Sequence, residues 1–159
     1  MLEIKITKKD IEKTSERLFD DSKFTISSHG KEYGLLAEQI FLNNFGGELI
    51  GSRGYDIWLP PLNKIDVKTK VCRSEPLPHY TCSVSAYQQK NDSDYYVFFR
   101  MLKDKSKCWI LGCLPKQEFF DRAEFVKAGT RDGGFLSKID MYSIEISELR
   151  SVFDEIYRS

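Results

Sequence analysis

The pattern of apolar and polar residues predicts two helices in the first part of the chain. Residues 7–21 predict a polar helix with Ile11 and Leu18 among its apolar contacts. Thr7 and Asp10 have the spacing of a helix N-cap with a capping box, which predicts where this helix begins.

A stronger helical pattern covers residues 30–45, and the pair Gly46-Gly47 predicts its end. Its apolar residues recur at helical spacing, at Tyr33, Leu36, Ala37, Ile40 and Phe41. This segment is therefore predicted to pack one face against the core of the protein.

After the second helix, short runs rich in apolar and β-branched residues predict a series of strands. Residues 60–63, with the sequence PPLN, separate two of these runs. Prolines do not continue a strand, so this link is predicted to be a hairpin turn, and a second hairpin is predicted across residues 103–107. The predicted strands are residues 48–51, 54–59, 64–71, 79–86, 95–102 and 107–114.

The last part of the chain alternates between helical and strand patterns. Residues 115–127 open on proline and predict an amphipathic helix, and residues 129–134 predict a Gly-rich polar loop. Residues 141–146 predict a strand, and residues 147–157 predict a final helix capped by Ser147.

This order of elements predicts an α/β or α+β domain in which helices flank one mixed central sheet. The length suits one domain over residues 1–159. Within it, residues 1–29 are predicted to be a helical extension, residues 30–100 the core that carries the motif described below, and residues 101–159 the remaining strands and helices.

Charge and cysteine content exclude some classes of protein. The net charge is zero, with 24 basic and 24 acidic residues, which argues against a polybasic nucleic-acid binder but not against a local basic surface. The chain has four cysteines and no Cys-x-x-Cys pair, so a zinc site is not expected. Three cysteines, Cys82, Cys108 and Cys113, are in apolar runs and predict buried, reduced thiols. With no leader-like or membrane-spanning run, the expectation is a cytoplasmic protein.

The most informative stretch is an acidic strand followed by an Asp-x-Lys triplet. A strand points Asp66 and Lys68 to one face and Val67 into the core. In a hairpin that turns at residues 60–63, Asp56 lies on the partner strand roughly level with the triplet. Two carboxylates and one ammonium group are therefore predicted to converge on one patch.

Such a patch suits hydrolysis of a phosphodiester bond. Two carboxylates can hold Mg²⁺ (or Mn²⁺) through oxygen ligands and leave positions open for water and phosphate. The metal lowers the pKa of its bound water, while an adjacent lysine orients or deprotonates that water or stabilises developing charge. Glu38, in the middle of the second helix, is the preferred further acid, and Glu32 is the next candidate.

The triplet alone has little weight, because Glu3-Ile4-Lys5 and Asp21-Ser22-Lys23 match it too. Only Asp66-Val67-Lys68 has an acidic residue on a neighbouring predicted strand and a glutamate-bearing helix before it. The argument for a site therefore rests on this placement.

A helix with Glu38, then Gly54-Tyr55-Asp56, then Asp66-Val67-Lys68, resembles the PD-(D/E)xK, restriction-endonuclease-like nucleases. The small size and the run IDVKTK are also similar to nucleases of phage and Holliday-junction-resolvase type. The resemblance covers about residues 30–100 and implies a mixed sheet flanked by helices.

By this resemblance, Asp56, Asp66 and Glu38 would bind metal and Lys68 would be the catalytic lysine. Tyr55 departs from the proline of the family motif, at a position that often varies. Either Gln88 or Gln89 matches a glutamine that some members carry just after the motif strands.

Plainer interpretations stay open for several residues. The patch also fits a solvated strand face with an ion pair. Lys64, Lys70 and Arg73 can contact the phosphate backbone of DNA, or can merely keep an edge strand soluble. His79 can lie near the site, although a lone histidine is more often structural.

The leading hypothesis is a Mg²⁺-dependent endodeoxyribonuclease that binds DNA and does not associate with membranes. A homodimer is plausible because cutting two strands needs two sites. The alternatives are a non-catalytic nucleic-acid- or protein-binding domain on the same fold, and a structural or inhibitory protein whose acids are incidental.

Overall fold

The computed structural model describes residues 1–21, 31–51, 54–132 and 135–158. Its helices are α1 (Lys8–Asp21), α2 (Lys31–Phe45), α3 (Lys116–Arg122) and α4 (Val152–Tyr157), with two short 3-10 helices, η1 (Ala86–Lys90) and η2 (Ile146–Glu148). Its strands are β1 (Leu2–Lys5), β2 (Glu48–Leu49), β3 (Ile57–Leu59), β4 (Asn63–Cys72), β5 (Thr81–Ser85), β6 (Tyr95–Leu102), β7 (Lys107–Pro115), β8 (Glu124–Val126), β9 (Arg131–Asp132), β10 (Phe135–Leu136) and β11 (Met141–Glu145).

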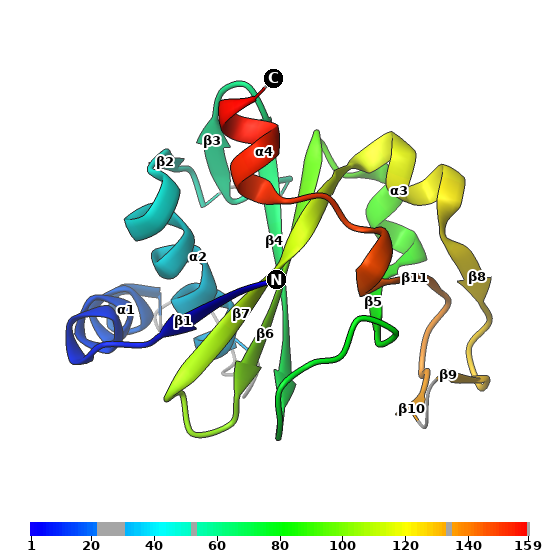
Figure 1. Ribbon diagram of the computed structural model, residues 1–159, viewed down its shortest axis with the longest axis horizontal. Helices are drawn as coiled ribbons and strands as arrows, with labels where there is room; N and C mark the ends of the chain where they lie inside the picture. The colour runs from blue at the N-terminus through cyan, green and yellow to red at the C-terminus, as the bar shows by residue number, and fades with distance from the viewer. Residues whose placement is uncertain (22–30, 52–53, 133–134, 159) are drawn as a thin grey trace.

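A six-stranded sheet with the order β1-β7-β6-β4-β3-β2 forms the centre of the molecule (Figure 1). Only β4 and β6 pair in parallel, and the other neighbours in this large sheet are antiparallel. A mixed α+β fold with one mixed sheet, as the sequence predicted, is therefore confirmed.

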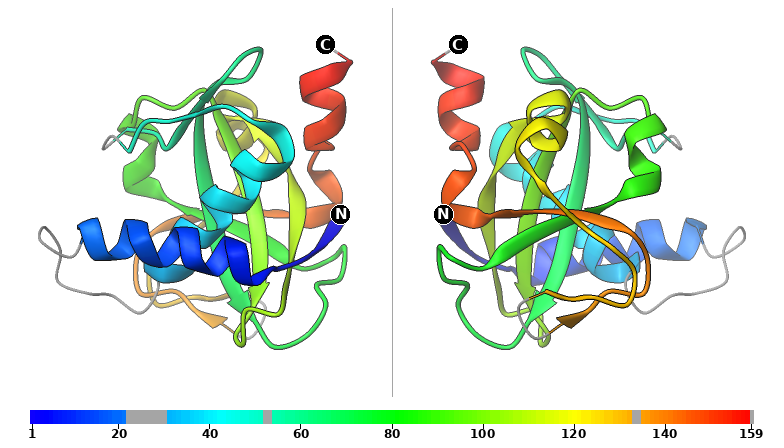
Figure 2. Two further views of the ribbon diagram at one scale, coloured as in Figure 1. Left: turned by 90° about the vertical axis from the view of Figure 1, so that its left-hand side faces the viewer. Right: turned by 90° about the vertical axis from the view of Figure 1, so that its right-hand side faces the viewer.

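A second, three-stranded sheet with the order β5-β11-β8 was not predicted as a separate layer. Figure 2 shows α1 and α2 on one side of the large sheet and this small sheet on the other. The small sheet is antiparallel throughout, with β11 in the middle. The face of the large sheet away from α2 therefore lies opposite the small sheet.

The prediction of one helix over residues 115–127 was wrong in its second half. The helix ends at Arg122, and Glu124–Val126 pair with Met141–Ser143 of β11 instead. The final helix also begins later than predicted, because Ser151 rather than Ser147 caps it. Pairing with a distant strand has overridden a local helical pattern in the first case.

The N-terminal segment contains a strand that the sequence pattern did not reveal. Leu2 pairs with Ile110 and Lys5 with Lys107, so β1 extends the large sheet at one edge. Leu2–Lys5 alternates apolar and polar residues, but four residues is the shortest run from which a strand is inferred. The extension predicted as helical thus joins the sheet before it enters α1.

Both predicted N-terminal helices are present. In α1 the capping box is confirmed, because the Thr7 N–H donates to the Asp10 carboxylate and the Asp10 N–H donates to the Thr7 hydroxyl. Ile11, predicted as an apolar contact, is only partly covered at 38% exposure, and the side chain of Leu18 lies outside the part that the structure describes. Gly46, with a positive φ of 83°, ends α2.

The large sheet separates two hydrophobic clusters. The α2-side core includes Phe41 of α2 with Ile65 and Val67 of β4. The small-sheet-side core includes Phe98 of β6 with Val84 of β5. The alternation along each central strand decides which residue joins which core.

The predicted state of the cysteines is confirmed in the described structure. Cys82, Cys108 and Cys113 are buried free thiols, and burial raises the pKa of each to about 12. Within the described ranges, no helix has the length and apolar character needed to cross a membrane.

Candidate active site on the β3–β4 hairpin

The hairpin formed by β3 and β4 carries the predicted patch. Ile57 pairs with Ile65 in antiparallel register, so Asp56, the residue before β3, lies level with Asp66. The turn lies where residues 60–63 predicted it. The expectation that both acidic strands are adjacent is confirmed by this register.

Regular pairing between the two strands stops at Asp56. The Asp56 N–H donates to the carbonyl of Ile65, at 2.8 Å, and Ile65 is already the partner of Ile57. Beyond this point β4 has no partner strand on that edge within the described sheet. Asp56 Oδ2 accepts a hydrogen bond from the Val67 N–H at 2.8 Å, so the carboxylate takes the place of a neighbouring strand.

Asp66 and Lys68 form the centre of the patch. Lys68 Nζ lies 2.8 Å from Asp66 Oδ1 and donates to Gln88 Oε1 at 2.6 Å. Asp66 is buried, with 6% of its surface exposed, and the side chain of Lys68 is 23% exposed. Asn91 Nδ2 also donates to Gln88 Oε1, at 3.3 Å, and so helps to position the glutamine side chain.

Glu38 reaches the patch from α2. It is buried, and Arg17 Nη2 of α1 lies 3.6 Å from Glu38 Oε1. The same guanidinium donates to the carbonyl of Leu35, one turn earlier in α2. Glu38 therefore has a cation from α1 beside it, as Asp66 has Lys68.

The pKa of Asp56 responds to both of the other carboxyl groups. The pKa of Asp56 is raised from 3.8 to about 7, first by burial and then by the negative charges of Glu38 and Asp66. The Val67 N–H and Lys68 oppose this rise. No lysine or arginine of the described residues forms an ion pair with Asp56, whereas Asp66 has Lys68 and Glu38 has Arg17 beside it.

A metal ion would have to be held by fewer than three of these acids as they lie. Within the described ranges, no group of three or more His, Cys, Asp or Glu side chains is placed to hold a metal. Mg²⁺ is usually bound through one or two carboxylates with waters and substrate phosphate completing the shell. Asp56 and Asp66, which lie level across the hairpin, are the two carboxylates that this mode would use.

The predicted phosphate-contacting residues are spread along β4. Lys64 Nζ is bonded to Asp92 Oδ2 at 2.8 Å, at the start of the strand. Lys70 is exposed and lines a cavity beside Lys68, and Arg73 is exposed just after the strand ends. The structure therefore brings Lys70 near the patch and gives Lys64 an acidic partner.

Three of the lower-ranked candidates lie away from the patch. Glu32 forms an ion pair with Lys105 of the β6–β7 turn. His79 packs edge-on against Tyr80 before β5 begins, whereas Gln88 follows the other end of β5. Gln89 is exposed, so Gln88 is the glutamine that reaches Lys68.

Supporting residues of the site were missed by sequence reasoning. Arg17 lies in a helix predicted from its polar pattern, and nothing local indicates that it approaches Glu38. Asn91 supports Gln88, and Lys116 of α3 donates in turn to the carbonyl of Asn91. Only the spacing of Gln88 and Asn91, one turn of a short helix, could have indicated their contact.

The chain was also compared with known proteins. No protein-family model matches it, and no curated protein matches it.

Proposed function

We propose that this protein is a Mg²⁺- or Mn²⁺-dependent nuclease that hydrolyses phosphodiester bonds in DNA, on a restriction-endonuclease-like arrangement of a mixed sheet and flanking helices. The observation that carries the proposal is the position of the Lys68 ammonium group, 2.8 Å from Asp66 Oδ1 and 2.6 Å from Gln88 Oε1. Asp56 lies level with Asp66 on the neighbouring strand.

Each residue of the patch has a role in this proposal. Asp56 and Asp66 are the residues that would hold the metal, with Glu38 as a further acid. Bound Mg²⁺ supplies charge neutralisation at the phosphate and a water of lowered pKa. A lysine has three N–H donors, and Lys68 uses two of them on Asp66 and Gln88. Its third donor is suited to a phosphate oxygen or to the attacking water.

Two further parts of the proposal concern the setting of the protein. The buried free thiols of Cys82, Cys108 and Cys113 support a reducing compartment such as the cytoplasm. A homodimer would supply the two sites that cleavage of both strands of a duplex requires.

The proposal is tested by a cleavage assay with single-stranded, duplex and branched DNA in Mg²⁺, in Mn²⁺ and in EDTA. We expect metal-dependent cleavage of at least one substrate, and a loss of about a hundredfold or more in Asp66→Asn and in Lys68→Gln. Asp121→Asn, on the exposed side of α3, makes the same chemical change away from the patch and should cleave normally. Undiminished cleavage by both patch variants would overturn the site.

A second candidate is a non-catalytic nucleic-acid- or protein-binding domain. The pairing of Lys68 with Asp66 and of Arg17 with Glu38 favours it, because such pairs can be purely structural. A thermal melt with and without Mn²⁺ separates the two candidates, since a ligand that binds only the native state raises its stability. The nuclease should melt at a higher temperature in Mn²⁺ and the binding domain should not.

A further inference from the structure

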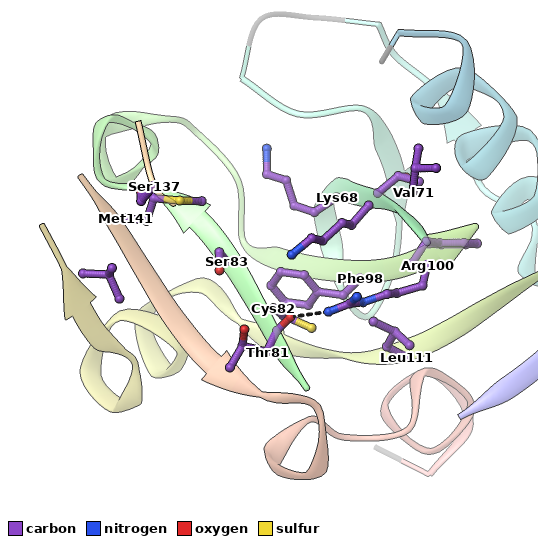
Figure 3. Close-up of a pocket in the computed structure, with 14 residues that line it drawn as sticks. Lys68, Val71, Thr81, Cys82, Ser83, Phe98, Arg100, Leu111, Ser137 and Met141 are labelled. Atoms are coloured by element: carbon purple, nitrogen blue, oxygen red, sulfur yellow. Dashed lines mark hydrogen bonds between the residues drawn. The ribbon is translucent and has the colours of Figure 1, made fainter. Parts of the chain in front are cut away.

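A cavity lies between the large sheet and the small sheet, directly beside the candidate active site. Its volume is about 470 Å³, within the range of pockets that hold one small organic group. Figure 3 shows Phe98 and Arg100 of β6 facing Thr81 and Ser83 of β5 across this space. Lys68 lines the same cavity, so the cavity and the patch share one residue.

Among the described residues, the charged side chains that line the cavity are all positive. Lys68, Lys70 and Arg100 line it, and the described residues of its wall include no aspartate or glutamate. Arg100 Nη2 donates to the carbonyl of Thr81 at 2.8 Å, and this arginine forms no ion pair within the described ranges. A wall of this kind favours an anionic ligand.

The rest of the wall is partly apolar and partly hydroxyl-bearing. Phe98 and Leu111 lie buried behind it, Val71 and Met141 contribute more exposed apolar surface, and Ser83 contributes a hydroxyl group. A ligand that fits must therefore combine a flat or apolar body with hydrogen-bonding groups and negative charge. A nucleotide has these three properties, with its base, its sugar and base edges, and its phosphate.

We propose that this cavity receives one unpaired nucleotide next to the phosphodiester bond that the patch hydrolyses, so that the substrate is single-stranded or locally unpaired nucleic acid. The inference rests on the proposed nuclease function. The base packs against the more exposed apolar side chains of the wall, Val71 and Met141, and Lys70 and Arg100 face its phosphate. Lys68 then contacts the cavity and the reacting phosphate together.

The two sheets explain why the strand must be unpaired. β5 and β11 contribute one wall and β4 and β6 the other, and a volume of about 470 Å³ suits one nucleotide and is too small for a duplex. A base inside a duplex would first have to leave its stack, which weakens binding. A strand that is already unpaired avoids that cost and binds in preference.

The inference is tested by fluorescence anisotropy in EDTA, which measures binding without metal-dependent cleavage. The probes are a labelled short oligothymidylate, a duplex of equal length and free thymidine monophosphate. We expect the single strand to bind about tenfold more tightly than the duplex and than the mononucleotide. Stronger binding to the duplex, or binding of the mononucleotide as tight as that of the strand, would overturn the inference.

Variants at the cavity wall test whether the single strand binds in the cavity. Ser83→Leu fills the cavity and Arg100→Gln removes its charge, and each should weaken single-strand binding about fivefold to tenfold while duplex binding is unchanged. Arg122→Gln, the same change on the exposed surface of α3, should alter binding less than about twofold. Unchanged binding in folded Arg100→Gln and Ser83→Leu would reject the cavity, with folding checked by circular dichroism.

The binding experiment and the cleavage assay can fail independently of each other. Selective single-strand binding lost in the cavity variants supports the cavity even if no metal activates cleavage. Metal-dependent cleavage with cavity variants that bind and cleave normally supports the nuclease and rejects the nucleotide cavity.

Discussion

The two faces of β4 differ in chemistry although they alternate along one strand. On the face toward α2, Ile65 and Val67 are buried in the α2-side core. On the face toward the small sheet, Asp66 and Lys68 form an ion pair beside a cavity. The first face is closely packed and apolar, whereas the second is charged and borders a cavity.

This difference indicates how one strand can serve both stability and binding. Burial of apolar side chains stabilises the fold on the α2 side. On the other side, burying Asp66 removes it from water, and Lys68 with Gln88 has to offset that loss. Variants on the two faces should therefore affect stability and activity in different proportions.

The largest expected effect on stability is at the apolar face. Ile65 is fully buried, so Ile65→Ala should lower the free energy of unfolding by about 3 kcal/mol through lost contacts and a cavity. The melting temperature should fall by about 10 °C, with cleavage per folded molecule unchanged. Ile139→Ala, at a residue 44% exposed, is the matched control and should change little. A loss of activity per folded molecule in Ile65→Ala would show that the apolar face also contributes to activity.

On the charged face, Lys68→Gln should destabilise the protein by about 2 kcal/mol, because Asp66 is left buried without its cation. Combining it with Asp66→Asn removes both charges and should restore most of the stability but none of the activity. Urea denaturation and the cleavage assay measure the two effects. Recovery of activity in the double variant would contradict the catalytic role of the pair.

The expected effect of Asp56→Asn on stability is of similar size and has the opposite sign. Because the Asp56 pKa is raised from 3.8 to about 7, ionisation in the folded protein reduces its stability as the pH rises through that interval. Asn keeps an acceptor for the Val67 N–H without the charge, so at about pH 8 the variant should be more stable, on the order of 2 kcal/mol. The gain should vanish near pH 4, and thermal melts across this range measure it.

A gain of equal size at both ends of that pH range would show that charge is not its cause. In Mn²⁺ the wild-type protein should recover stability that the variant cannot, since the variant lacks the ligand.

The smallest expected effect is at Lys64. It shares the charged face of β4, but its ion pair with Asp92 is at the surface, and the Asp92 side chain is 75% exposed. Solvent screening makes such pairs weak, so Lys64→Gln should leave the thermal melt nearly unchanged. A shift as large as that of Lys68→Gln would mean that exposure does not separate the two lysines.

Local pattern was sufficient to predict the hairpin. The proline pair and the alternation around Ile65 and Val67 determine the turn, the register and the face of Asp66. The helix with Glu38 was predictable from its apolar spacing. Each of these depends on residues close together in the chain.

The environment of the patch depends on contacts that are distant in the chain. Gln88 reaches Lys68 because β5 pairs with β11, and the segment at Glu124–Val126 is a strand because it joins the same sheet. The wall of the cavity comes from these pairings. No local pattern marks such a surface, which is why the cavity was not predicted.

The connection between the parallel strands β4 and β6 also bears on the order in which the protein can fold. This connection carries β5 and η1, and with them Gln88. β5 has its only described partner strand in β11, which a ribosome makes much later than the hairpin. A nascent chain can thus form the β3–β4 hairpin early, while Lys68 receives its glutamine only after the C-terminal strand has emerged. Pairings so far apart in the chain are slow to form, so the complete environment of Lys68 would be among the last features to form during synthesis.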